Sequence, residues 1–273
     1  MRTIIRSTVY LIALGSFSLA ARAGVVFQQE GGEVGAGKPK QAMTISIDSG
    51  KIRVDGDDSS RGKYAIIFDS NKQVLWMLSP GEGTYREMTG AEIEGMGQQM
   101  SQAMQRMQEQ LATVPPEQRA MVEQMMKKQM GGMPGGGAAA APTITVEEKG
   151  SEKVGQFNTT HYAVSTNGQL SQEIWAASND QVHIDEADLK TFQALSKFFE
   201  PLSRNAPKGS WSAPTMQQIK GMPVRTLVYE GARPATEWNV IKVEQRSVAG
   251  SQFTLPSGMK KAPPMGMPMG MGK

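Results

Sequence analysis

The sequence predicts an α+β protein in which an antiparallel β-sheet is built in two halves, with a helical hairpin inserted between them. Three observations lead to this fold class. Short β-favouring runs alternate with turn clusters on both sides of the chain's middle. The middle itself, residues 88–130, is rich in Met and Gln and contains no aromatic residue. A stripe of aromatic and aliphatic residues at helical spacing follows Asp185.

The first half reads as an antiparallel meander of short strands joined by turns. The expected strands are Thr44–Asp48, Lys51–Asp55, Tyr64–Asp69, Gln73–Leu78 and Thr84–Glu87. The DGDD run at residues 55–58 is read as a solvated turn, because the ligand pattern of a calcium loop is missing. Within 73–78, Trp76 points to one face and Leu75 to the other, so this strand should be covered on both sides. The Met-rich hairpin is one candidate for that cover.

The hairpin is predicted from the spacing of its apolar residues. One stripe runs through Ile93, Met96, Met100, Met104, Met107 and Leu111. Pro115-Pro116 ends this first helix and starts a second, which ends at Gly131-Gly132. Residues 131–142 then form a Gly/Ala/Pro linker. The methionines either pack on a β-surface or partner helix, or they offer an adaptable surface to varied apolar ligands.

The second half contains further strands and one helix. Strands are expected at Thr143–Glu147, Thr159–Ser165, Leu170–Ala177, Met222–Tyr229 and Thr236–Val248, with a short edge strand at Phe253–Leu255. Asp185 is the expected N-cap of the aromatic-rich helix, which should end or bend near Pro201. Residues 260–273 are Met, Gly, Pro and Lys, with a single Ala, and we expect a disordered tail.

The N-terminus predicts secretion. Arg2 and Arg6 precede an apolar run, and Ala21-Arg22-Ala23 fits a cleavage site, so residues 1–23 read as a signal peptide cleaved after Ala23. We therefore expect a periplasmic or secreted protein without a stable transmembrane anchor, with a single domain over residues 24–259. The net charge of +3 and the interleaved acidic and basic residues argue against nucleic acid as a partner.

Residues suited to catalysis are few. The chain has no Cys, and its two histidines, His161 and His183, lie outside any catalytic motif. We therefore expect no enzyme, no catalytic residue, no cofactor and no metal site among the leading interpretations. The one motif that suggests a metal is the alternating series Met265, Met267, Met269 and Met271, because thioethers select Cu(I). A solvated low-complexity tail explains the same residues.

Several segments resemble a known family. GKIRVDG, AIIFDSNKQVLWMLSPGEGTYREMT, PPEQRAMVEQMM, VGQFNTTHYAV, QEIWAA, GMPVRTLVYEG and FTLPSGMKK are similar to the bacterial secreted family named domain of unknown function 4412. More coarsely, the two halves resemble the LolA-like lipoprotein-carrier superfamily. That resemblance implies a curved antiparallel half-barrel that holds helices and an apolar cavity, and therefore a role in ligand binding.

Function is expected to follow from an apolar cleft. The leading hypothesis is a non-enzymatic carrier that binds a lipid or an apolar polypeptide segment. Its expected cleft residues are Trp76, Trp175, Trp238, Phe199, Met100 and Met104. The alternatives are a chaperone-like or structural protein that acts through the Met-rich helices, and copper binding by the tail. A hydrolase that uses carboxylates with His161 is the third class.

Overall fold

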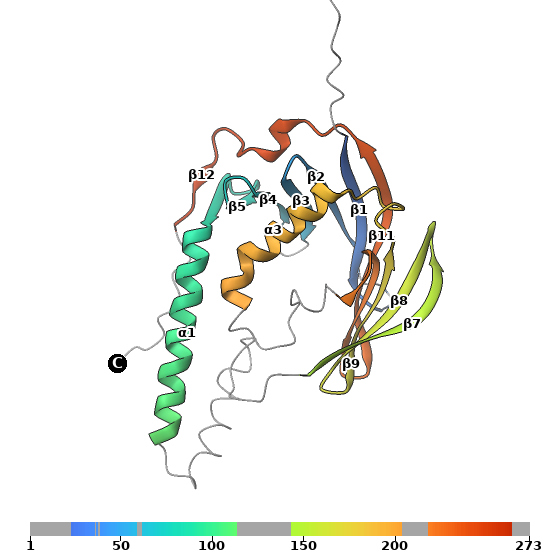
Figure 1. Ribbon diagram of the computed structural model, residues 1–273. Coiled ribbons are helices and arrows are strands. Elements are labelled where there is room, and N and C mark those ends of the chain that lie inside the picture. Colours follow the sequence, from blue (N-terminus) through green and yellow to red (C-terminus); the bar gives the residue numbers. More distant parts are fainter. Residues whose placement is uncertain are drawn as a thin grey trace, which may run out of the picture.

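One curved β-sheet dominates the protein, and two helices lie on its inner side (Figure 1). The computed structural model describes residues 23–35, 37, 39–58, 62–113, 143–203 and 218–263. The predicted signal peptide up to residue 22, the second arm of the hairpin, the linker and the Met-rich end therefore lie outside the described residues.

The sheet is a chain of antiparallel neighbours. Its strands are β1 (Gly24–Glu33), β2 (Gln41–Asp48), β3 (Lys51–Asp58), β4 (Gly62–Asp69), β5 (Val74–Ser79), β6 (Thr84–Thr89), β7 (Ile144–Val154), β8 (Phe157–Thr166), β9 (Gln169–Ala177), β10 (Met222–Glu230), β11 (Arg233–Arg246) and β12 (Lys260–Lys261). Their spatial order is β12-β6-β5-β4-β3-β2-β1-β11-β10-β9-β8-β7. Only the β12–β6 pair is parallel among the described strands. Because the order runs from β12 to β7 without returning, the described sheet is open.

Strand β1 joins the two halves, and the sequence analysis did not predict it. It pairs with β2 on one side and with β11 on the other, so it closes the gap between the first meander and the second. Val25, Val26 and Phe27 are all almost fully buried, because β1 is covered on both faces at this end. The polar and glycine-rich continuation QQEGGE hides this strand in the sequence.

Two helices begin at reciprocal side-chain caps. Helix α1 (Gly90–Thr113) follows Thr89, whose Oγ1 accepts from the Glu92 amide while Glu92 Oε2 accepts from the Thr89 amide. Helix α3 (Glu186–Ser203) follows Asp185, whose Oδ1 accepts from the amides of Ala187 and Asp188. The predicted N-cap at Asp185 is confirmed. Helix α1 corresponds to the first helix of the predicted hairpin.

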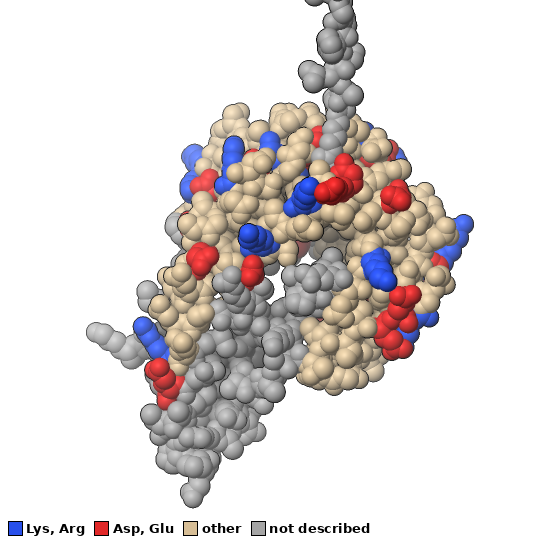
Figure 2. Space-filling view, viewed as in Figure 1, with Lys and Arg blue, Asp and Glu red and all other residues tan. Residues whose placement is uncertain are grey.

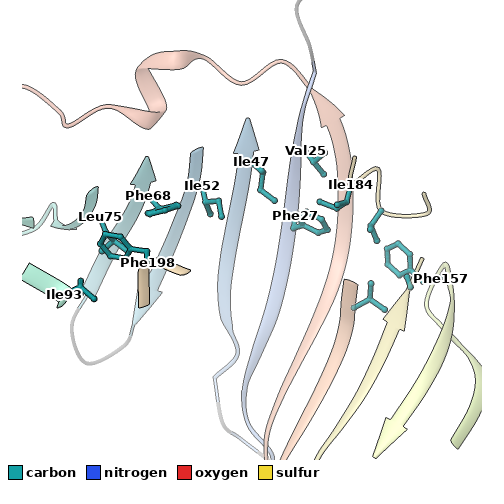
Figure 3. Close-up of a cluster of buried hydrophobic side chains, with 13 residues drawn as sticks. Val25, Phe27, Ile47, Ile52, Phe68, Leu75, Ile93, Phe157, Ile184 and Phe198 are labelled. Atoms are coloured by element: carbon teal, nitrogen blue, oxygen red, sulfur yellow. The ribbon is translucent and has the colours of Figure 1, made fainter. Parts of the chain in front are cut away.

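The largest core lies between the helices and the sheet. It gathers buried side chains from many elements, among them Val25, Phe27, Ile47, Ile52, Phe68, Leu75, Ile93, Phe157, Ile184 and Phe198 (Figure 3). Phe68 of β4 meets Phe198 of α3 edge to face, with ring centroids 5.4 Å apart. We call the side of the sheet that carries this core the inner face.

A second core covers the opposite side of β4 and β5. Val74, Trp76 and Leu78 pack there with Val248 and Phe253. The expected two-sided cover of β5 is confirmed: Ile93 of α1, in the first arm of the Met-rich hairpin, packs in the inner core with Leu75, and the described cover of the outer side is the C-terminal segment. The predicted edge strand at Phe253–Leu255 is wrong. Phe253 instead ends a 3-10 turn, η1 (Gly250–Phe253), that turns its ring into this core.

The start of the expected disordered tail is ordered. Lys260 and Lys261 form β12, and the backbone amides of Lys260 and Ala262 donate to the carbonyls of Gly83 and Tyr85. Lys261 Nζ also lies 2.7 Å from Glu87 Oε1. These contacts hold the chain after η1 against β6, so the prediction of disorder from residue 260 is wrong for 260–263.

Candidate functional site

Apolar side chains on the inner face become progressively more exposed along β2, β3 and β4. At the helix-covered end, Ile47, Ile52 and Phe68 are buried. Two residues further along each strand, their same-face neighbours are only half-buried; these are Ile45, Val54 and Ile66. The inner face therefore remains apolar beyond the region that the core fills completely.

The next row on the same face ends in an aromatic ring that lies over a glycine. Met43 of β2 pairs with Gly56 of β3, and Gly56 pairs with Tyr64 of β4. A Cβ atom placed on Gly56 would lie 2.3 Å from Tyr64 Cζ. The Tyr64 ring therefore lies down on the Gly56 backbone, and the absence of a side chain at residue 56 is what permits this.

Strand β11 repeats the arrangement. Trp238 pairs with Gly31 of β1, and a Cβ on Gly31 would lie 2.4 Å from Trp238 Cδ2. Because β2 alone separates β1 from β3, the two ring–glycine contacts lie about 10 Å apart across the sheet and about 7 Å apart along it, since Gly31 pairs with Gln41 and Gly56 with Met43. We call Trp238, Tyr64 and Met43, with the two glycines beneath the rings, the ring platform. All three side chains of the platform are half-buried.

Of the predicted cleft residues, Trp238 and Phe199 lie on the inner face. Phe199 packs against the inner core and meets Phe198 at a centroid distance of 5.1 Å. Met100 is half-buried on α1, and Met104 lies one turn further along that helix, where the side chain is not described. Helix α1 approaches α3 closely at Gly97, where an added Cβ would lie 2.6 Å from the Pro201 carbonyl oxygen.

The structure does not place Trp76 or Trp175 with them. Trp76 belongs to the outer core beside Phe253, and its Nε1 donates to Glu87 Oε2 at 2.9 Å. The pairing register shows that Trp175 also faces away from the platform. Trp238 pairs with Thr226, which pairs with Ile174, so Ile174 shares the face of Trp238 and its neighbour Trp175 points to the other.

Trp175 is instead the centre of a stacked ladder of side chains across three strands. Its ring stacks on His161 of β8, with centroids 4.4 Å apart and planes 4° from parallel. The Arg225 guanidinium of β10 lies 4.3 Å from the Trp175 ring centroid. Register explains the order, since His161, Trp175 and Arg225 are direct cross-strand partners.

Carboxylates complete the ladder. One oxygen of Glu173 accepts from the Tyr229 hydroxyl, and the other lies 3.0 Å from His161 Nε2. Arg225 Nε donates to Glu237 at 2.9 Å, and Trp175 Nε1 donates to Glu152 at 2.7 Å. The hydrogen bond to Glu173 raises the pKa of Tyr229, because ionising the phenol would place a second negative charge beside that carboxylate.

The ladder brings an imidazole and a carboxylate together at His161 and Glu173, which is the kind of pair that hydrolases use. Trp175 is 5% exposed, however, and both of its faces are covered, so the indole offers no open surface to a substrate. The charged groups around it already pair with one another. As an arrangement, the ladder holds β8, β9 and β10 together, while the ring platform offers half-exposed apolar surface.

The sequence analysis did not include three residues of the ring platform among the expected cleft residues: Tyr64, Gly56 and Met43. Residues 55–58 were read as a turn, but they continue β3 to Asp58. The available signal was a glycine inside a run that can pair with a strand carrying an aromatic residue, since strand glycines often mark close approach of another group. A strand register was needed to connect Gly56 with Tyr64, and the sequence does not supply one.

Two further properties bear on the candidate functions. In the described part of the chain, no helix is long and apolar enough to cross a membrane. The described residues also contain no group of three or more His, Asp or Glu side chains that could hold a metal ion. The methionines proposed for copper, residues 265–271, lie outside the described residues.

The open antiparallel sheet with two helices on its inner face defines an α+β class, and the sequence places the chain in a particular family. The profile of the family "Domain of unknown function (DUF4412)" matches residues 86–259, so the chain belongs to this family. The match begins at Arg86, and the similarity noted for GKIRVDG and for most of AIIFDSNKQVLWMLSPGEGTYREMT lies outside it. No curated protein matches the chain.

Three solved structures show a distant likeness. An uncharacterised conserved protein from Thermus thermophilus has a TM-score of 0.44 and 6% identity, with 88% of this chain and 90% of that chain covered. PNGF-II has a TM-score of 0.36 and 8% identity, with 88% of this chain and 32% of that one covered. The LolA superfamily protein NE2245 from Nitrosomonas europaea has a TM-score of 0.26 and 9% identity, covering 86% and 90%.

Proposed function

We propose that the protein binds a lipid acyl chain on the inner face of its sheet, over the ring platform and the half-buried row beside it. The observation that carries this proposal is the apolar surface that runs from Ile45, Val54 and Ile66 to Met43 and Tyr64. Trp238 adds a ring on the same face, beyond Gln29 and Gln41. Apolar surface that stays partly exposed in a folded protein is characteristic of ligand grooves and interfaces.

The chemistry of the surface favours an acyl chain. Its side chains are aliphatic, thioether or aromatic, and such groups gain free energy from burial without needing a directional polar partner. Covering the exposed part of several such groups yields about 25 cal/mol for each Å² removed from water. A hydrocarbon chain can follow the strip across β2, β3 and β4, whereas the amide side chains on this face, Gln29 and Gln41, lie between Met43 and Trp238.

Binding of a fluorescent fatty acid tests the proposal. We expect saturable binding of cis-parinaric acid by protein from which endogenous lipid has been extracted, and a copurified lipid mass in native mass spectrometry of protein from its own source. The matched variants are Trp238→Ala, which removes a platform ring, and Ile241→Ala, which removes an exposed side chain from the same strand. Absence of saturable binding together with absence of copurified lipid would reject the proposal.

We also propose that the protein acts outside the cytoplasm and is not an enzyme. The residues that fit a signal peptide support export, as does the start of β1 at Gly24, directly after the expected cleavage point. The interspersed acidic and basic groups on the visible face (Figure 2) support a partner other than nucleic acid. A hydrolase screen with His161→Ala as the control tests the second point, and turnover lost in that variant would contradict it.

A second candidate is a contact surface for apolar polypeptides on the Met-rich helix. It is favoured by the course of α1, whose C-terminal half extends past α3 (Figure 1). Deleting residues 101–130, which keeps Ile93 and Met96 in the inner core, separates the candidates. A protein that holds its ligand on the sheet should still bind cis-parinaric acid after the deletion, whereas a chaperone acting through this helix should lose its suppression of client aggregation.

A further inference from the structure

The two ring–glycine contacts of the platform differ in one respect. At Gly31 an added Cβ would lie 2.3 Å from the Glu237 carbonyl oxygen, so the backbone itself excludes a side chain there. At Gly56 the nearest atoms are all in Tyr64, namely Cζ, the hydroxyl oxygen and Cε1, at 2.3, 2.4 and 2.6 Å. The obstacle at Gly56 is thus the far end of one side chain, which can rotate away.

The backbone at Gly56 does not need a glycine. Its φ is not in the left-handed region, unlike that of Gly50 just before β3 or Gly62 at the start of β4, where φ is +76° and +75°. Inside a strand, glycine costs stability relative to a residue with a side chain. Gly56 therefore carries a local cost that neither its conformation nor contact with the main chain of a neighbouring strand explains.

We infer that Gly56 sets the depth of the acyl-chain site, by letting Tyr64 lie flat on β3 instead of standing up from the inner face. This inference rests on the proposed function. With a Cβ at residue 56, the Tyr64 ring must lift toward the space above the sheet, which the proposed ligand occupies. Tyr64 is then a specificity-determining residue and Gly56 its positioning partner.

Chain length should reveal the effect. The platform lies beyond the row of Ile45, Val54 and Ile66, on the side away from the buried core. A lifted Tyr64 ring obstructs that outer end of the strip and leaves the row next to the core free. Octadecanoic acid should therefore lose more affinity than dodecanoic acid when Tyr64 is raised.

The experiment compares Gly56→Ala with Gly81→Ala in binding of cis-parinaric acid and in competition by the two saturated acids. Gly81 has open space where its Cβ would be, so it controls for the substitution itself. We expect Gly56→Ala to weaken binding of the long chain by roughly tenfold, equal to about 1.4 kcal/mol, without lowering Tm. A stable fold with weaker binding is the outcome that a purely structural role would not give.

Tyr64→Ala supplies the decisive second variant. Once the ring is absent, alanine at residue 56 has nothing to lift, so the double variant should bind as Tyr64→Ala does. Binding by Gly56→Ala equal to that of the wild type, additive effects in the double variant, or a loss of binding that merely follows a lower Tm would each overturn the inference. Failure of the wild type to bind any fatty acid would instead reject the proposed function, and the inference with it.

Discussion

Replacing Phe253 by Ala should destabilise the protein strongly while leaving the inner face intact. Phe253 is 3% exposed and packs with Val26, Ile67 and Trp76 on the outer side of the sheet. The turn that carries it is tied to β3, because Arg53 Nη1 donates to the Gln252 carbonyl oxygen at 2.7 Å. The ring therefore has a fixed position, and the surrounding strands cannot easily close over the space that it leaves.

The size of the effect follows from burial. Truncating a buried Phe to Ala costs about 3–5 kcal/mol, because transfer free energy is lost and a cavity remains. In a domain of this size each kcal/mol lowers Tm by roughly 2–4 °C, so we expect a decrease of roughly 6–20 °C. Ile241→Ala is the control, since Ile241 is 52% exposed and its truncation should change stability by less than about 0.5 kcal/mol.

Thermal melts followed by circular dichroism measure both variants, and fatty-acid binding is then measured well below the lower Tm. If Phe253→Ala lowers the free energy of unfolding by less than about 1 kcal/mol, the assignment of the C-terminal segment as the outer cover of the sheet is refuted. Loss of binding at a temperature where Phe253→Ala is folded would refute the independence of the two faces.

Three further predictions concern the edge of the sheet and the ladder. Ending the chain after Met259 removes β12, whereas ending it after Pro263 keeps β12. Two backbone hydrogen bonds, each contributing about 1 kcal/mol net to the free energy of unfolding, are lost only in the shorter chain. We therefore expect a Tm lower by a few degrees for the shorter chain alone. The Lys261 ammonium lowers the pKa of Glu87, so this pair stabilises the fold above about pH 4.5 and ceases to do so as pH falls through the lowered value. Melts of Lys261→Met and wild type should therefore differ at neutral pH and converge in acid, and a constant difference would contradict the pairing. The raised pKa of Tyr229 means that its hydrogen bond to Glu173 stabilises the fold below pH 10.0 and is lost as pH rises through the higher value. In an ultraviolet titration of folded protein, the phenol that Tyr229→Phe removes should ionise above pH 10.0, and a missing phenol that ionises at or below that pH would contradict the bond.

Most strands could be predicted because short β-favouring runs were separated by turn residues. Asn167-Gly168, for example, turns β8 into β9 with both residues at positive φ. Strand β1 could not be predicted, because QQEGGE has no alternation and its pairing with β11 joins residues more than 200 positions apart. Phe253 was assigned to a strand because an isolated aromatic residue fits a strand or a buried turn equally well.

The candidate site was only partly predictable for a related reason. The choice of Trp238 and Phe199 rested on their size, and size does not distinguish the two faces of a sheet. Trp76 and Trp175 were grouped with them for the same reason, although register and the outer core place both on the other face. A glycine inside a strand, Gly56, was the sequence feature that could have indicated the ring platform. That indication requires the strand pairing that brings Tyr64 over Gly56, and the sequence does not give the pairing.

The most direct test of ligand binding on the inner face uses the four tryptophans as reporters. One variant keeps only Trp238 and another keeps only Trp175, with the other three replaced by Phe in each case. Dibromostearic acid, whose bromines quench indole fluorescence at short range, is then titrated into both. Binding over the ring platform predicts saturable quenching of Trp238 and little change in Trp175. Equal quenching of the two, or quenching of Trp175 alone, would contradict the account.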